Sequence, residues 1–276
     1  MINNIQDTVT LNNGVKMPGF GLGVYKVEDG DTVVQSVKAA LKHGYRSIDT
    51  ASFYDNETGV GRGIKESGVP REELFVTSKV WNDQQGYENT LKAFDESLDK
   101  LGLEYLDLYL IHWPVKDKYK ETWRALEKLY DEGKVRAIGV SNFHVHHLQD
   151  LMADSNVKPV IDQVEYHPHL TQTEVKAFCE KENIQLEAWS PLKKGRILDD
   201  PTISGLAEKY GKSPAQVILR WGVQNNVVLI PKSVNEHRIV ENADIFDFAL
   251  TDEEMKQISG LNKNERTGTN PDSFDE

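Results

Sequence analysis

The sequence is poor in cysteine, in long apolar runs and in clustered positive charge, and each shortage excludes a class of protein. Cys179 is the single cysteine in 276 residues, so an internal disulfide framework is excluded and a reducing, cytoplasmic setting is expected. No segment approaches the roughly 18 uninterrupted apolar residues that a membrane span needs. The first residues, Met1 to Asp7, lack the basic flank and the apolar stretch of a secretory signal.

Acidic residues outnumber basic ones by 44 to 32, which gives a formal net charge of −12. The lysines and arginines are scattered and form no basic tract, so we expect neither nucleic acid nor an anionic membrane as a partner. An acidic surface without an evident apolar patch is compatible with a monomer. With 38% hydrophobic and 28% charged residues, the composition is that of a soluble globular protein that can bury a full core.

The hydrophobic pattern alternates short strand-like runs with amphipathic helical runs. Between Gln85 and Leu101, apolar residues recur at steps of four and three, as on one face of an α-helix. We predict helices at residues 31–43, 85–101, 118–132, 172–182, 213–225, 234–243 and 251–261. We predict strands at residues 19–22, 46–48, 74–78, 106–111, 135–140, 160–164, 185–188 and 227–230.

Several predicted strands, such as 106–111 and 227–230, are apolar nearly throughout, which is typical of strands covered on both faces in a parallel sheet. Eight strands with helices between them predict an α/β fold, a (β/α)8 TIM barrel, as a single domain over residues 1–276. A short hairpin at residues 8–17 precedes the barrel, and the extra helix at 251–261 follows it. A doubly wound sheet is the main rival, but the glycine-rich segment 19–23 opens no helix at the GxGxxG spacing.

The residues just past the strands of such a barrel lie on its C-terminal face, where active sites are found. Each of them alone has an ordinary explanation, such as a helix cap or a solvated loop residue. Together they predict an active site. These strand-end residues are Asp49, Lys79, His112, Ser141, Asn142, Gln163, Trp189, Ser190, Lys232 and Ser233.

Three segments of the sequence resemble signatures of the aldo-keto reductases. They are GYRSIDTA at 44–51 with Tyr54, Asn56 and Glu57, RAIGVSNF at 136–143, and IPKS at 230–233 with Arg238, Glu241 and Asn242. The resemblance extends from about residue 8 to residue 262 and is strongest to the short bacterial glyoxal/methylglyoxal and 2,5-diketogluconate reductases. It implies an NADPH-dependent reductase of small aldehydes, ketones or α-dicarbonyls.

The resemblance also implies a catalytic set of Asp49, Tyr54, Lys79 and His112. A hydride delivered to a carbonyl carbon leaves the carbonyl oxygen in need of a proton, and Tyr54 is the candidate acid. A free tyrosine has a pKa of about 10, and the ammonium of Lys79 is expected to lower it by favouring the phenolate. Asp49 would pair with Lys79, and a neutral His112 would orient and polarise the carbonyl.

An NADPH site is implied by the same resemblance. Trp189, unless it is a core residue near the rim, would stack on the nicotinamide. Ser141, Asn142 and Gln163 suit the carboxamide of that ring. Lys232, Ser233 and Arg238 bring two cations and a hydroxyl to one turn, as a 2′-phosphate requires, which favours NADPH over NADH. Further cofactor-binding residues are expected at Val24, Tyr25, Ser190, Leu192 and Asn242.

An apolar substrate pocket is expected at the mouth of the barrel. Longer family members close their pocket with an extended C-terminal loop, whereas this chain stops soon after its last predicted helix, so an open, permissive site is expected. Lys193 and Lys194 stand near the expected diphosphate site, where related sequences carry uncharged residues, and they either strengthen NADPH binding or face solvent. The residues predicted to line the pocket are Tyr25, Phe53, Trp81, His112 and Trp113.

Five further histidines show no recognised ligand spacing with acidic or cysteine partners, so no metal site is predicted. We expect Cys179, on a predicted helix, to be a packing residue. The histidines are His144, His146, His147, His167 and His169.

Two other functions stay open from the residues alone. An NADPH-binding sensor with little turnover would share the cofactor site, although the complete catalytic set argues against it. A barrel isomerase of sugar phosphates would need a carboxylate base beside the histidine, and Asp49 is already committed to Lys79. The physiological substrate and the preferred reaction direction are not encoded in recognisable motifs.

Overall fold

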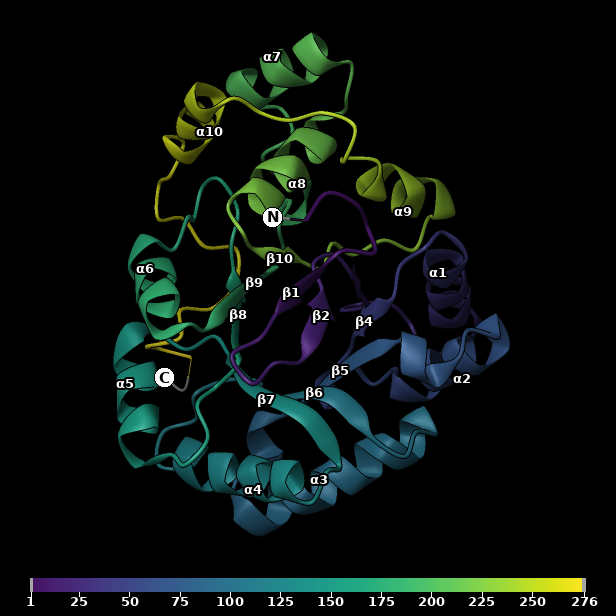
Figure 1. Cartoon of the computed structure of the whole chain (residues 1–276), viewed down its shortest axis with the longest axis vertical. Helices are drawn as coiled ribbons and strands as arrows, with labels where there is room; N and C mark the ends of the chain where they lie inside the picture. The colour runs from purple at the N-terminus through teal and green to yellow at the C-terminus, as the bar shows by residue number, and fades with distance from the viewer. Residues whose placement is uncertain (1, 275–276) are drawn as a thin grey trace.

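The computed structural model describes residues 2–274, and its centre is a barrel of parallel strands surrounded by helices (Figure 1). Eight strands follow one another around the barrel in chain order, each hydrogen-bonded to the next. They are β3 (Leu22–Gly23), β4 (Ser47–Asp49), β5 (Phe75–Val80), β6 (Leu106–Ile111), β7 (Val135–Ser141), β8 (Ile161–Glu165), β9 (Gln185–Trp189) and β10 (Val228–Leu229). The predicted (β/α)8 barrel is confirmed.

The first and last strands close the barrel through a narrow seam. Parallel bridges join Phe20 to Leu229 and Gly23 to Lys232. A Cβ atom on Gly23 would lie 2.7 Å from the carbonyl oxygen of Ile230, so the seam leaves no room for a side chain at this position. The pairing places Lys232 at the same level as the end of β3.

The strands are buried on both faces, as their apolar sequences predict. All six residues of β6 are buried, because its two faces pack on the barrel interior and on the surrounding helices. The predicted strands agree with the observed ones to within a few residues, and the largest difference is at the first strand. Only Leu22–Gly23 of that region forms a regular strand, and the preceding residues join the barrel through the single bridge at Phe20.

A hairpin closes the N-terminal end of the barrel. Strands β1 (Thr8–Thr10) and β2 (Lys16–Pro18) pair antiparallel, and Figure 1 shows them crossing the centre of the barrel. Met17 and Leu11 are buried against apolar residues of the barrel strands, including Leu108. The predicted hairpin is therefore present and fills the base of the barrel.

Helices cover the outside of the barrel. The predicted helices are found, and three more are present that the hydrophobic pattern did not predict, namely α2, α5 and α7. The helices are α1 (Asp31–Lys42), α2 (Glu57–Ser67), α3 (Tyr87–Leu101), α4 (Tyr119–Asp131), α5 (Val145–Asp154), α6 (Thr173–Glu182), α7 (Pro201–Tyr210), α8 (Pro214–Gln224), α9 (Glu236–Ala243) and α10 (Asp252–Ser259).

Helix α2 escaped prediction because it is rich in glycine, which disfavours a helix by about 1 kcal/mol per residue relative to alanine. Its glycines serve packing. A Cβ atom on Gly61 would lie 2.1 Å from the carbonyl oxygen of Leu101 at the end of α3, and one on Gly63 would lie 2.9 Å from Val37 of α1. Tertiary contact with the two neighbouring helices therefore outweighs the low helix propensity.

No helix within residues 2–274 combines the length and apolar character that crossing a bilayer requires.

Cys179 lies on α6 and is 1% exposed within the main apolar core. Its role as a packing residue is thus consistent with its position, and burial raises the pKa of its thiol.

Candidate active site

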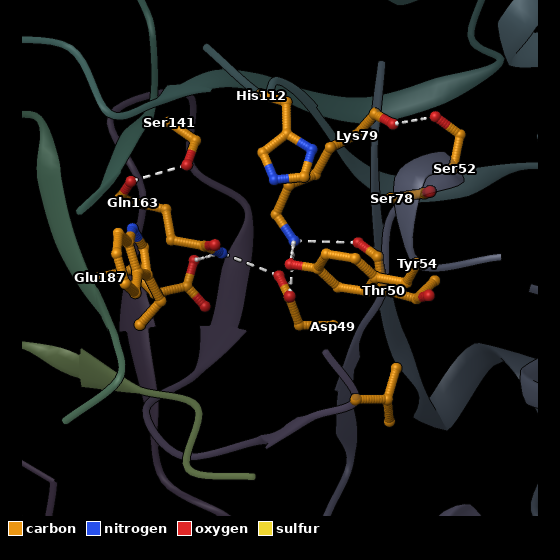
Figure 2. Close-up of polar contacts among 12 residues, drawn as sticks. Asp49, Thr50, Ser52, Tyr54, Ser78, Lys79, His112, Ser141, Gln163 and Glu187 are labelled. Atoms are coloured by element: carbon orange, nitrogen blue, oxygen red, sulfur yellow. Dashed lines mark hydrogen bonds and ion pairs between the residues drawn. The ribbon is translucent and has the colours of Figure 1, made fainter. Parts of the chain in front are cut away.

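The strand ends bring four predicted catalytic side chains together at the C-terminal face of the barrel (Figure 2). Asp49 ends β4, Lys79 lies near the end of β5, and His112 directly follows β6. Tyr54 comes from the short helical turn after β4, Ser52–Tyr54. Neighbouring parallel strands thus supply one cluster from residues far apart in the sequence.

Lys79 is the centre of the cluster and is fully buried. Its Nζ donates to Oδ1 of Asp49 at 2.6 Å, to the backbone oxygen of Thr50 at 2.9 Å and to the hydroxyl oxygen of Tyr54 at 3.1 Å. The three hydrogens of the ammonium therefore each have an acceptor. Since the oxygen of Tyr54 accepts from Lys79, the hydrogen of Tyr54 remains available for another acceptor.

The expected lowering of the pKa of Tyr54 by Lys79 is outweighed by burial. Burial raises the pKa of Tyr54, and although the ammonium of Lys79 opposes this rise, the pKa still reaches about 12. For Lys79, burial alone would lower the pKa, but the Asp49 carboxylate and the Tyr54 hydroxyl raise it above its usual value. At neutral pH the site therefore holds a protonated phenol beside a charged ammonium.

His112 stands over this cluster with the properties of a neutral hydrogen-bond donor. Burial, and then the charge of Lys79, hold the pKa of His112 well below its usual range. Its ring lies edge-on to those of Tyr54 and Trp81, with ring centroids 5.8 and 5.0 Å apart. The neutral imidazole retains one N–H, which can donate to a carbonyl oxygen without competing for the proton of Tyr54.

The candidates for the nicotinamide site are linked to one another and to the catalytic cluster. Nε1 of Trp189 donates to Oδ1 of Asn142 at 2.9 Å, and Nδ2 of Asn142 donates to the backbone oxygen of His112 at 3.0 Å. Oγ of Ser141 donates to the backbone oxygen of Gln163 at 2.8 Å. The structure therefore places these predicted side chains together and fixes their orientations before any ligand binds.

Sequence reasoning missed Glu187, which faces the catalytic cluster from β9 (Figure 2). Nε2 of Gln163 donates to Oδ2 of Asp49 at 2.8 Å and to Oε2 of Glu187 at 3.1 Å. Burial, together with the charge of Asp49, raises the pKa of Glu187 to about 8. The signal in the sequence is a glutamate between Leu186 and Ala188 within a predicted strand, because burial at such a position is costly for a charge.

The predicted phosphate-binding residues gather where β10 leads into α9. Lys232 and Arg238 are exposed, and within residues 2–274 no hydrogen bond or ion pair engages either charged group. Ser233 is buried in the turn, where its Oγ accepts from the backbone N–H of Asn235 at 3.1 Å. Two uncommitted cations therefore flank a helix N-terminus, an arrangement suited to a phosphate.

The remaining predicted cofactor residues lie on the same rim. Val24 is buried, and its backbone oxygen accepts from Nδ2 of Asn56 at 3.0 Å. Ser190 has a positive φ of 51° just after β9. Leu192 follows in the same loop and packs against the core. Asn242 is buried on α9.

Aromatic side chains surround the mouth of the barrel as predicted. Phe53 stacks on Trp81 with ring centroids 3.7 Å apart, and Tyr25 lies 5.0 Å from Tyr54 by the same measure. Phe53 and Tyr25 are 47% and 44% exposed, so their faces are available to a ligand. Trp113 completes the set, and its ring contacts that of Phe274 in the C-terminal tail.

The C-terminal tail, residues 262–274, lies along the mouth and contacts Trp113. The ring of Phe274 lies 5.2 Å from that of Trp113. At the other side of the mouth, the backbone N–H groups of Thr267 and Gly268 donate to the carboxylate of Glu165 at 2.7 and 2.9 Å. The short tail thus forms a wall of the mouth.

Lys193 and Lys194 both contact residues of this tail. Lys193 is 3% exposed, and its Nζ contacts Oε1 of Glu265 at 2.6 Å and Nδ1 of His169 at 2.7 Å. Nζ of Lys194 donates to the backbone oxygen of Thr267 at 3.0 Å. The two lysines therefore join the loop after β9 to the tail, and Lys193 does not face solvent.

Three histidines gather with an acidic residue that sequence spacing did not connect to them. His144, His146 and His147, at the start of α5, lie with Asp272 so that their ligand atoms are within 4.8 Å of one another. Arg266 donates to Nε2 of His144, and the backbone N–H of His144 donates to Nδ1 of His147. Nδ1 of His144 and Nε2 of His146 contact the carboxylate of Asp272 at 2.9 and 2.7 Å, so the cluster attaches the tail to α5.

Comparison with known proteins agrees with this geometry. The sequence model described as the Aldo/keto reductase family matches residues 19–263. The chain is 65% identical over 274 residues to the glyoxal reductase of Bacillus subtilis strain 168, covering 99% of each chain. It is 45% identical over 270 residues to the methylglyoxal reductase DkgA of Escherichia coli strain K12, covering 96% of this chain and 97% of the relative.

Solved structures give the same result. The crystal structure of a Bombyx mori aldo-keto reductase in complex with NADP superposes with a TM-score of 0.91 at 39% identity, covering 100% of this chain and 98% of that one. The fold, the arrangement of the site and the sequence similarity over nearly the whole length all agree with the aldo-keto reductases. The chain belongs to the aldo/keto reductase family.

Proposed function

We propose that this protein is an NADPH-dependent reductase of small carbonyl compounds, in particular α-dicarbonyls such as glyoxal and methylglyoxal. The observation that carries the proposal is the buried cluster in which Lys79 holds Asp49 and Tyr54 beside a neutral His112. The names of two relatives, a glyoxal reductase and a methylglyoxal reductase, support the substrate class. We further propose that residues 1–276 act as one domain, as a monomer, in the cytoplasm.

In the proposed reduction, Tyr54 is the proton donor, and Lys79, Asp49 and His112 support the transfer. When bound, NADPH supplies the hydride that forms the new C–H bond at the carbonyl carbon. Tyr54 gives its proton to the carbonyl oxygen, so that the product is an alcohol and Tyr54 becomes a phenolate. Lys79 stabilises this phenolate through the hydrogen bond that it already makes to the same oxygen, and Asp49 holds Lys79 in place. His112 donates its N–H to the carbonyl oxygen and orients the substrate.

The cofactor residues are proposed from their chemistry. Asn142 and Gln163 offer amides to the carboxamide of the nicotinamide, and Trp189 offers an aromatic face. Lys232 and Arg238 supply charge to the 2′-phosphate, and this phosphate distinguishes NADPH from NADH. The residues of the loop after β9 and of the first strand end would line the rest of the cofactor.

The function is tested by following NADPH absorbance with methylglyoxal for the parent protein and for Tyr54→Phe. Removing a general acid is expected to lower kcat by roughly 10²–10⁴-fold, whereas NADPH affinity should change little. Replacing NADPH with NADH should weaken binding, and Arg238→Ala should reduce that difference.

Tyr105→Phe is the matched control, because it removes a phenolic hydroxyl from a ring that packs on Arg71 and belongs to none of the proposed sites. It should retain most of the activity. A parent protein that binds NADPH but reduces neither glyoxal nor methylglyoxal would contradict the proposal and favour the sensor.

A further inference from the structure

Glu187 and Asp49 are the two carboxyl groups that contact the amide of Gln163. Gln163 and Glu187 are direct neighbours across the parallel strands β8 and β9, and both side chains are buried. With Lys79, they form one continuous row of polar groups across the barrel, from Tyr54 to Glu187 (Figure 2).

The two contacts determine which way the amide of Gln163 points. If its oxygen faced the carboxylate of Asp49, an acceptor would oppose an acceptor, which is unfavourable. The nitrogen therefore faces them, and both of its hydrogens are used. Oε1 of Gln163 accepts no hydrogen bond from residues 2–274, so it is the free acceptor of this side chain.

We propose that Glu187 is a positioning residue for the cofactor, which fixes the amide of Gln163 so that its oxygen accepts from the carboxamide N–H of the nicotinamide. The inference rests on the proposed function, since it takes Gln163 as a cofactor contact. Glu187 itself touches neither cofactor nor substrate, and its effect is transmitted through the hydrogen bond at 3.1 Å.

The protonation state of Glu187 matters because Asp49 lies on the other side of Gln163. The charged groups in this row are Asp49 from β4 and Lys79 from β5, and Tyr54 is the further titratable group. Since the pKa of Glu187 is about 8, Glu187 is mostly neutral at pH 7. Above this pH a second carboxylate shares the charge of Lys79, which then stabilises the phenolate of Tyr54 less well.

The first test measures binding, so it does not depend on turnover. Glu187→Leu removes the acceptor, and we expect its Kd for NADPH to rise about tenfold, the net effect of roughly one lost hydrogen bond. Its Kd for 2′-phospho-ADP-ribose, which lacks the nicotinamide, should be unchanged. Equal weakening of both ligands, or of neither, would overturn the proposal.

Glu187→Gln is the conservative variant and covers the case in which Glu187→Leu fails to fold. It keeps an acceptor for Gln163 and cannot ionise, so it should bind NADPH like the parent. The parent should lose kcat above about pH 8, and Glu187→Gln should not. An alkaline loss that is the same in both proteins would contradict the role of this proton.

Asp162→Asn is the matched control. Asp162 is also a fully buried acid on β8, and burial raises its pKa well above the usual range, but it has no hydrogen bond to Gln163 or Asp49. Its replacement should alter neither the NADPH affinity nor the alkaline loss of kcat. If the parent binds NADPH and reduces no carbonyl, the proposed function fails, while the binding test of Glu187 still stands.

Discussion

At the scale of single residues, the site depends on one buried cation that satisfies several partners. Lys79 compensates the charge of Asp49 and contacts the oxygen of Tyr54, and Lys79 and Asp49 are almost completely buried. Removing one member of a buried pair leaves the other charge uncompensated in a medium that cannot solvate it.

Lys79→Met is therefore expected to lower the free energy of unfolding by about 3–5 kcal/mol, as well as to abolish turnover. Urea unfolding followed by circular dichroism measures this loss. The double variant Lys79→Met, Asp49→Asn removes the orphaned charge and should recover part of the stability without recovering activity. If the double variant is no more stable than the single one, uncompensated charge is not the cause.

The pKa of His112 is lowered well below its usual range by burial and by Lys79. The imidazole therefore stays neutral as the pH falls through 6.5, and the proposed N–H donor keeps its form. We expect no inflection near pH 6.5 in kcat/KM for methylglyoxal between pH 5.5 and 7.5. An inflection there that is lost in His112→Gln would show that His112 titrates normally.

Asp49, Lys79 and His112 could be predicted from the sequence because each stands at or next to a strand end, where the barrel brings side chains to one face. Tyr54 lies beyond the strand end and was implied by the family resemblance. Glu187 could not be predicted in this way, since it lies inside a strand and its role depends on which residue faces it across the sheet. Likewise, the contact of Lys193 with Glu265 joins two loops whose approach no local pattern encodes.

At the scale of elements, two of the helices that the hydrophobic pattern did not predict, α2 and α7, have different reasons for existing. Helix α2 carries glycines because its backbone approaches α1 and α3 closely, and this approach cannot be inferred from helical periodicity. Helix α7 has an Asp200 cap whose side chain accepts from the backbone N–H groups of Thr202 and Ile203, followed by Pro201. This Asp-Pro start is a local signal for a helix in the sequence.

Two Gly→Ala substitutions with opposite expected signs test this account. Gly61→Ala places a methyl group 2.1 Å from the carbonyl oxygen of Leu101 and should lower the free energy of unfolding by about 1–3 kcal/mol. Gly205→Ala, in α7, meets no atom within 4 Å and should raise it by about 0.5–1 kcal/mol. Chemical denaturation of both variants gives the comparison, and two changes of the same sign would refute it.

At the scale of the whole molecule, the tail connects parts of the rim that are distant in sequence. It contacts Lys193 through Glu265, Glu165 at the end of β8 through Thr267, and Trp113 through Phe274. These contacts could not be predicted from the sequence, because the length of a tail does not reveal where the tail lies.

Phe274→Ala should therefore affect large substrates more than small ones. A bulky apolar aldehyde such as phenylglyoxal needs an apolar wall, so its KM should rise severalfold, while the KM for glyoxal should stay near that of the parent. Steady-state kinetics with both substrates measures the difference. Val240→Ala, an exposed apolar residue on α9, is the control, and an equal rise of KM for both substrates would exclude a selective wall.

The position of Cys179 has a consequence for an enzyme that handles electrophiles. α-Dicarbonyls add readily to thiolates, and the only thiol of this chain is 1% exposed in the core, with a pKa that burial raises. A protonated, inaccessible thiol is a poor nucleophile. The protein is thus protected at cysteine from alkylation by the compounds that it is proposed to reduce.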